Sequence, residues 1–144
     1  MALEWTQDYS IGIKDIDDQH KELFDRINML QNAMMAGKGE QEIEGTFKFL
    51  EEYIVLHFSS EEKLQYGAGY PDYPGHKDLH EAFKKTFVEL KRKFDSSGAR
   101  KTAVAIEINK AVSDWIIKHI FVEDKKVGRF LKEKRSEVTL KAII

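Results

Sequence analysis

Cysteine is absent from this 144-residue chain, which excludes disulfides, thiolate metal ligands and thiol catalysis. Proline and glycine are scarce, at two and nine residues, and this scarcity favours helices. Long apolar runs are also missing: no stretch approaches the roughly 20 residues that cross a bilayer. The first residues, Met1 to Asp8, lack the basic and apolar stretches of a secretion signal. We therefore expect neither membrane insertion nor secretion, and by default a cytoplasmic protein.

The chain also lacks an excess of charge of one sign. Its 23 basic and 25 acidic residues give a formal net charge of −2, with no basic stripe that could neutralise phosphates. A nucleic-acid role therefore has no electrostatic basis. The length, together with an apolar content of 42%, suits one hydrophobic core. We expect a single domain over residues 1–144.

Four stretches carry residues of one face at alternating steps of three and four, the spacing of amphipathic helices. These seams are His20, Leu23, Phe24, Ile27, Leu30 and Met34; Ile43, Phe47, Leu50, Ile54, His57, Glu61 and Leu64; His76, His80, Phe83, Phe87, Leu90 and Phe94; and Val104, Ile108, Ala111, Trp115 and His119. The chain is predicted to form four helices, with the second and third seams closest to the heptad pattern of helical bundles.

Turn-forming residues separate the four seams. Gly37 and Gly39 end the first, the stretch 67–75 with both prolines predicts a loop after the second, and residues 96–98 follow the third. Short connections make sequential helices antiparallel neighbours, so we predict an all-α, up-down-up-down four-helix bundle with an irregular N-terminal arm. Beyond Asp124 the pattern weakens. The last apolar residues are expected either to dock or to fray: Val138, Leu140, Ile143 and Ile144.

All five histidines lie on these apolar seams, with at least one on every predicted helix. A single histidine on a seam is more often a core residue with a satisfied ring than a metal ligand. Five buried imidazoles, however, need partners for every ring nitrogen, and the neighbouring aliphatic and aromatic side chains offer none. Metal ions would meet that need.

Two carboxylates join the histidines. Glu61 lies on the same seam as His57, four residues later, and would be costly to bury without a cation. The pair His76 and His80 is one helical turn apart and lacks the glutamate of a zinc-protease helix. Asp124 follows His119 by five residues, which turns it about 140° away on an ideal helix. It would reach the same site only if the helix is overwound, bulged as in a π-helix, or ends there, so we expect irregular geometry near Phe121.

Nitrogen and oxygen ligands without sulfur suit iron, manganese or zinc. Two octahedral ions offer about twelve coordination positions. Five imidazoles, two bridging carboxylates and one solvent-derived bridge would leave one position open, enough for a small diatomic ligand such as dioxygen. Iron is the preferred metal because zinc lacks the redox chemistry that dioxygen binding requires.

The sequence resembles the hemerythrin family over the stretch from the arm at Trp5 to Asp124. The motifs that carry the resemblance are Asp17-Asp18-Gln19-His20, His57 to Glu61, His76 to His80, and Trp115-Ile116-Ile117-Lys118-His119 leading to Asp124. The resemblance implies that one iron is held by His76, His80 and His119. It implies that the second, with the open position, is held by His20 and His57. Glu61, Asp124 and an oxo or hydroxo group would bridge the two.

Six residues are candidates for the apolar wall of the open position, although ordinary core packing explains each one singly. They are Leu23, Phe24, Ile27, Ile54, Trp115 and Ile116. We expect reversible dioxygen binding, as carrier, store or sensor, and no enzymatic activity. The alternatives are a di-iron enzyme acting on nitric oxide, peroxide or dioxygen, and an iron-storage protein, whose sites are typically richer in carboxylates. A redox or signalling role would require a separate partner protein, which the sequence does not name.

Overall fold

The computed structural model of the chain describes residues 3–143, without the side chains of residue 40 and of residues 136–143. Long helices follow one another: α1 (Lys14–Met35), α2 (Glu40–Ala68), α3 (Tyr73–Asp95), α4 (Lys101–His119) and α5 (Lys125–Ile143). Shorter elements are the 3₁₀ turns η1 (Gln7–Tyr9) and η2 (Gly98–Arg100), and the π-helical turn η3 (Ile120–Asp124). The predicted all-α class is confirmed. The tail side chains for which docking or fraying was expected lie outside the described part.

The predicted loop over residues 67–75 is too long, because α2 continues to Ala68 and α3 begins at Tyr73. Gly69 ends α2 in the left-handed conformation, with a φ of 72°, which glycine adopts without steric cost. Pro74 lies in the first turn of α3, where its missing N–H group has no helical partner to lose. The prediction was wrong because a proline can start a helix as well as interrupt one.

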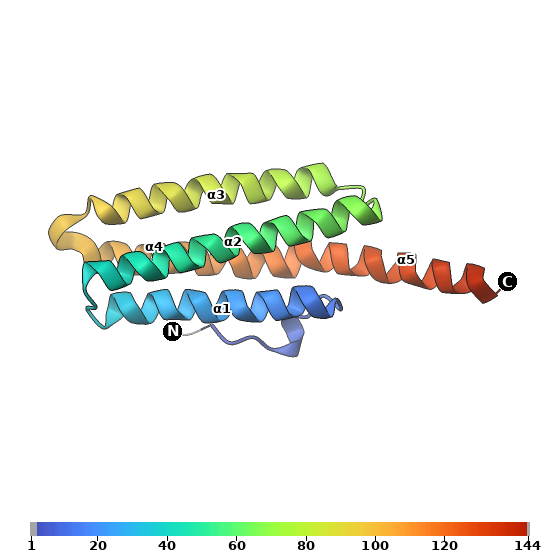
Figure 1. Ribbon diagram of the computed structural model, residues 1–144, viewed down its shortest axis with the longest axis horizontal. Coiled ribbons are helices and arrows are strands. Elements are labelled where there is room, and N and C mark those ends of the chain that lie inside the picture. The colour runs from blue at the N-terminus through green and yellow to red at the C-terminus, as the bar shows by residue number, and fades with distance from the viewer. Residues whose placement is uncertain (1–2, 144) are drawn as a thin grey trace.

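The helices α1 to α4 form an antiparallel bundle in which each packs on its two neighbours, and α4 closes the bundle against α1 (Figure 1). Apolar side chains from all four helices fill the interior, and the largest include Phe24, Phe47, Phe58 and Phe87. Burial of this apolar surface is the main force that holds such a bundle together. The predicted up-down-up-down topology is confirmed.

The helical path does not stop where α4 ends at His119 but continues through η3 into α5 without a break in direction. Figure 1 shows α4 and α5 along one axis, with α5 projecting past the ends of the other helices. The irregular geometry expected near Phe121 is therefore confirmed, in the form of a π-helical turn. This turn sets the direction of the side chains that follow it.

The N-terminal arm runs along α1 and is held by its backbone (Figure 1). Leu3 exchanges two hydrogen bonds with the Asn28 amide, both at 2.8 Å. The Asp17 carboxylate accepts hydrogen bonds from the Ile11 amide at 2.9 Å and the Ser10 hydroxyl at 2.5 Å. Among residues 3–143, no helix combines the length and apolarity needed to cross a membrane.

Candidate metal centre

Seven side chains from all four helices of the bundle and from η3 meet inside it. They are His20 on α1, His57 and Glu61 on α2, His76 and His80 on α3, His119 on α4, and Asp124 on η3. In an antiparallel bundle, the start of α1 lies beside the end of α2, the start of α3 and the end of α4. The alternating chain direction therefore gathers residues far apart in sequence at one end of the bundle. All seven are buried.

The Glu61 carboxylate divides its two oxygens between two groups of histidines. Oε1 lies 2.6 Å from His76 Nε2 and 3.7 Å from His80 Nε2. Oε2 lies 3.1 Å from His57 Nε2 and 3.8 Å from His20 Nε2. Glu61 is thus placed between the two groups, which is the arrangement that a bridging carboxylate requires.

The Asp124 carboxylate is divided in the same way. Its Oδ1 atom lies 3.1 Å from His119 Nε2 and 3.2 Å from His76 Nε2, and its Oδ2 atom lies 3.1 Å from His20 Nε2. The π-helical turn explains how it arrives there, since hydrogen bonds from i to i+5 bring residues five apart onto one face. An ideal α-helix would have pointed this carboxylate away from His119.

The histidines are unequally divided. The Nε2 atom of His119 lies 3.0 Å from that of His80 and 3.1 Å from that of His76, so three imidazoles converge on one point. His20 and His57 form a second, smaller group with ring centroids 4.7 Å apart. The two groups, together with the carboxylates, make two overlapping sets of potential cation ligands.

Several of the converging atoms are buried without a hydrogen-bond partner among the described residues: His20 Nε2, Glu61 Oε2, Asp124 Oδ1 and Asp124 Oδ2. Buried polar atoms are rarely left unpaired, because their desolvation is then uncompensated. A fully buried pair of carboxylates facing five imidazole nitrogens fits cations with nitrogen and oxygen ligands. The residues present therefore match the metal centre expected from the sequence.

Polar neighbours orient two of the histidines, and the sequence reasoning did not identify them. The His57 Nδ1–H group donates to Gln19 Oε1 at 2.8 Å, and the His80 Nδ1–H group donates to Glu62 Oε2 at 2.9 Å. With Nδ1 protonated, each ring directs the lone pair of Nε2 into the centre, the orientation that metal binding needs. In the sequence, Gln19 and Glu62 are marked only by their positions next to the seam residues His20 and Glu61.

A third neighbour, the buried Gln65, donates from Nε2 to Glu61 Oε1 at 3.4 Å. Gln65 lies one turn after Glu61 on α2. In the sequence it is therefore recognisable as a second polar residue on the buried face of this helix.

Without a metal ion, the charges of the centre favour protonation of two of its histidines. Burial opposes the charged form of His20 and of His76, but the carboxylates of Asp124 and Glu61 raise both pKa values to about 9. Burial, reinforced by the neighbouring histidines, lowers the pKa of His80 to about 3. His119, His20 and His76 hold the pKa of the Asp124 carboxyl well below its usual range despite its burial. The pocket is therefore built for two anionic carboxylates that need positive charge beside them.

The six residues proposed for an apolar wall are distributed unevenly. Five of them are almost completely buried in the main core: Leu23, Phe24, Ile27, Ile54 and Ile116. Trp115 is only partly buried, and its ring stacks on His119 with centroids 4.5 Å apart and 10° between the planes. It covers the centre from the outside.

The fold and the site define the class: a four-helix bundle whose interior carries a histidine- and carboxylate-rich cation site. The family model described as "Hemerythrin HHE cation binding domain" matches residues 11–131. The chain belongs to the hemerythrin family, and it is a hemerythrin-like cation-binding protein.

Relatives and solved structures agree with this assignment. The chain is 34% identical to the bacteriohemerythrin of Methylococcus capsulatus, over 89% of this chain and 96% of that protein. It is 32% identical to a bacteriohemerythrin of Pseudomonas aeruginosa, over 94% and 86% of the two chains. A crystal structure of wild-type hemerythrin superposes with a TM-score of 0.77 at 31% identity, covering 91% of this chain and 98% of the other.

Proposed function

We propose that the chain, as a single domain, binds dioxygen reversibly at a non-haem di-iron centre and serves as a carrier, store or sensor rather than an enzyme. One iron would be held by His76, His80 and His119, and the other by His20 and His57. Glu61, Asp124 and an oxo or hydroxo group would bridge them. The names of the related bacteriohemerythrins support this reading.

The observation that carries the proposal is the division of the ligands. Each carboxylate presents one oxygen to the group of three histidines and the other oxygen to the group of two. A site for one ion would instead gather all its ligands around one point. Two octahedral ions with unequal numbers of histidines would leave one coordination position on the side of His20 and His57, which one small ligand could occupy.

A pair of ferrous ions would supply the two electrons and the free position that dioxygen binding needs, which zinc cannot do. The protein's own part is to hold the ligands and exclude water. Gln19 and Glu62 fix the orientation of His57 and His80. Leu23, Phe24, Ile27, Ile54 and Ile116 would form the wall that keeps bulk water away from the vacant position, and Trp115, which stacks on His119, would shield the group of three histidines.

The test is to reduce the purified protein without oxygen, expose it to air and then remove the gas. We expect about two irons per chain, matching two sites with nitrogen and oxygen ligands. A visible absorption band should appear in air and disappear when the gas is removed, over repeated cycles. Continuous consumption of a reductant with nitric oxide, peroxide or dioxygen would show an enzyme instead. A protein that stays colourless and carries zinc would contradict the proposal.

Two variants locate the centre. His57→Leu removes a ligand from the group of two and should abolish the reversible band while lowering the iron content. Phe47→Leu is the matched control, since Phe47 is equally buried but packs against Phe87 and Phe94 rather than against the histidines. The control should keep about two irons. Equal iron content in both variants would refute the assignment of His57.

A further inference from the structure

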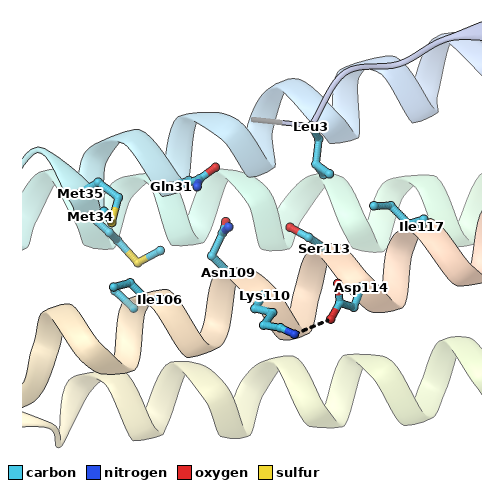
Figure 2. A pocket seen from close by; sticks show the side chains of 11 residues that line it. Leu3, Gln31, Met34, Met35, Ile106, Asn109, Lys110, Ser113, Asp114 and Ile117 are labelled. Atoms are coloured by element: carbon cyan, nitrogen blue, oxygen red, sulfur yellow. Dashed lines mark ion pairs between the residues drawn. The ribbon is translucent and has the colours of Figure 1, made fainter. Parts of the chain in front are cut away.

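A cavity of about 480 Å³ lies between α1 and α4, and none of the seven residues of the metal centre lines it (Figure 2). Pockets that bind small molecules usually occupy about 300–1,000 Å³ and combine apolar walls with a few polar groups. Figure 2 shows Met34 and Ile106 at one end of this cavity, and Leu3 and Ile117 at the other. Its size and lining are those of a ligand pocket.

The polar part of the lining is small and centred on Asn109. Figure 2 shows the Asn109 side chain rising from α4 toward α1, with Ser113 one turn further along the same helix. The Asn109 Oδ1 atom is buried and accepts no hydrogen bond from any residue of the described chain. An unpaired amide oxygen in a protein interior costs stability. The Asn109 amide lines the cavity, and a half-turn about its last side-chain bond would exchange Oδ1 with Nδ2, so that a ligand hydroxyl could donate to the oxygen.

The charges at the cavity argue for a neutral ligand. Lys110 and Asp114 are its only charged lining residues among those described, and their side chains pair with each other at 3.6 Å. Because these two charges offset each other, the cavity offers no net attraction for a charged ligand. A neutral hydroxyl group, in contrast, can donate to Asn109 and still interact with the Ser113 hydroxyl.

We propose that this cavity, defined by Leu3, Met34, Ile106, Asn109, Ser113 and Ile117, is a second ligand site, separate from the metal centre. Its ligand is a neutral, mostly apolar molecule of aromatic size that carries one hydroxyl group. The hydroxyl donates to Asn109, and the ring lies against Met34 and Ile106 at the nearer end of the cavity. Asn109 is thus a binding residue kept at a cost to folding.

The test compares two probes of nearly the same shape, 2-naphthol and 2-methoxynaphthalene, of which only the first has a donor. Equilibrium dialysis of the metal-loaded protein with each probe measures binding directly. Wild-type protein should bind 2-naphthol at least about tenfold more tightly, the difference expected for one buried hydrogen bond. Asn109→Leu keeps the size of the side chain but removes the acceptor, and should bind both probes equally.

Asn32→Leu is the matched control, because Asn32 is exposed on α1 and lies outside the lining. It should retain the wild-type preference. Ser113→Phe places a ring beside Asn109 in the cavity and should weaken the binding of both probes. Replacing an unpaired amide by an apolar group should leave Asn109→Leu at least as resistant to urea as wild type, whereas an asparagine needed for folding would lose stability.

Equal affinity of the two probes for the wild type, a preference that survives in Asn109→Leu, or no saturable binding would each overturn the proposal. The iron content of every variant provides an independent check that the bundle is intact, so a variant that fails to fold is recognised. In that event the comparison of the two probes on the wild type still decides the question.

Discussion

Replacing Glu62 by alanine should weaken iron binding by leaving the His80 ring without its outer partner. The Glu62 carboxylate accepts a hydrogen bond from His80 Nδ1–H at 2.9 Å, while the side chain of His80 is completely buried. Partners of this kind typically change metal affinity by about 10- to 100-fold, or about 1.4 to 2.7 kcal/mol. The Glu62 side chain is 14% exposed, so water can enter in its place. We therefore expect a loss of about tenfold, the lower end of that range.

Competition with a ferrous chelator under anaerobic conditions measures this loss. Glu62→Gln should retain most of the affinity, because its amide oxygen can still accept the hydrogen bond. Glu81→Ala is the control of equal charge: Glu81 also neighbours a histidine in sequence but pairs with Lys84 at the surface. If Glu62→Ala binds iron as tightly as Glu81→Ala does, the argument that Glu62 orients His80 is refuted.

Three further predictions concern stability. Gly128→Ala should lose about 3 kcal/mol by urea unfolding, because a Cβ atom there would come within 2.1 Å of the Ile11 carbonyl oxygen. Phe47→Ala should lose about 3–5 kcal/mol through the cavity it leaves, yet keep its iron, since Phe47 is fully buried away from the centre. The metal-free protein should lose stability as pH rises from 6.5 to about 9, because the raised pKa values of His20 and His76 contribute stability only while both are protonated.

Each of these has a direct check. Gly45→Ala, on α2 with no atom within 4 Å of the added methyl, should instead gain about 0.5–1 kcal/mol. An equal response of the two glycine variants would show that the contact with Ile11 is unimportant. Loss of iron in Phe47→Ala would show that the two ends of the bundle are coupled. A urea midpoint that does not fall between pH 6.5 and 9 without metal would contradict the pKa argument; the metal-loaded protein should show no fall, because the cation replaces the protons.

The sequence predicts most of the bundle because its signals are local and periodic. The seam through Phe47, His57 and Glu61 repeats for several turns, and only a helix places such residues on one face. Since the histidines share that periodicity, burial and convergence follow from the same pattern. The spacing of His119 and Asp124 predicted an irregular helix, and the π-helical turn meets that expectation.

Features that depend on packing between helices were not predictable. The hydrogen bond from His57 to Gln19 joins residues 38 positions apart, and that from His80 to Glu62 joins residues 18 apart. Their formation depends on helix rotation and on side-chain rotamers, which periodicity does not specify. The cavity beside Asn109 likewise results from how α1 and α4 meet, which the composition of neither helix reveals.

The chain continues without interruption from α4 through η3 into α5. Asp124, a residue of the metal centre, therefore lies within one continuous helical element. Asp124 is followed within one turn by Gly128, whose backbone touches the arm at Ile11. A displacement of the arm would therefore be transmitted to a carboxylate of the centre by a stiff element rather than by a loose loop. Affinity tags or truncations at the amino terminus should accordingly be designed with the spectrum of the metal in mind.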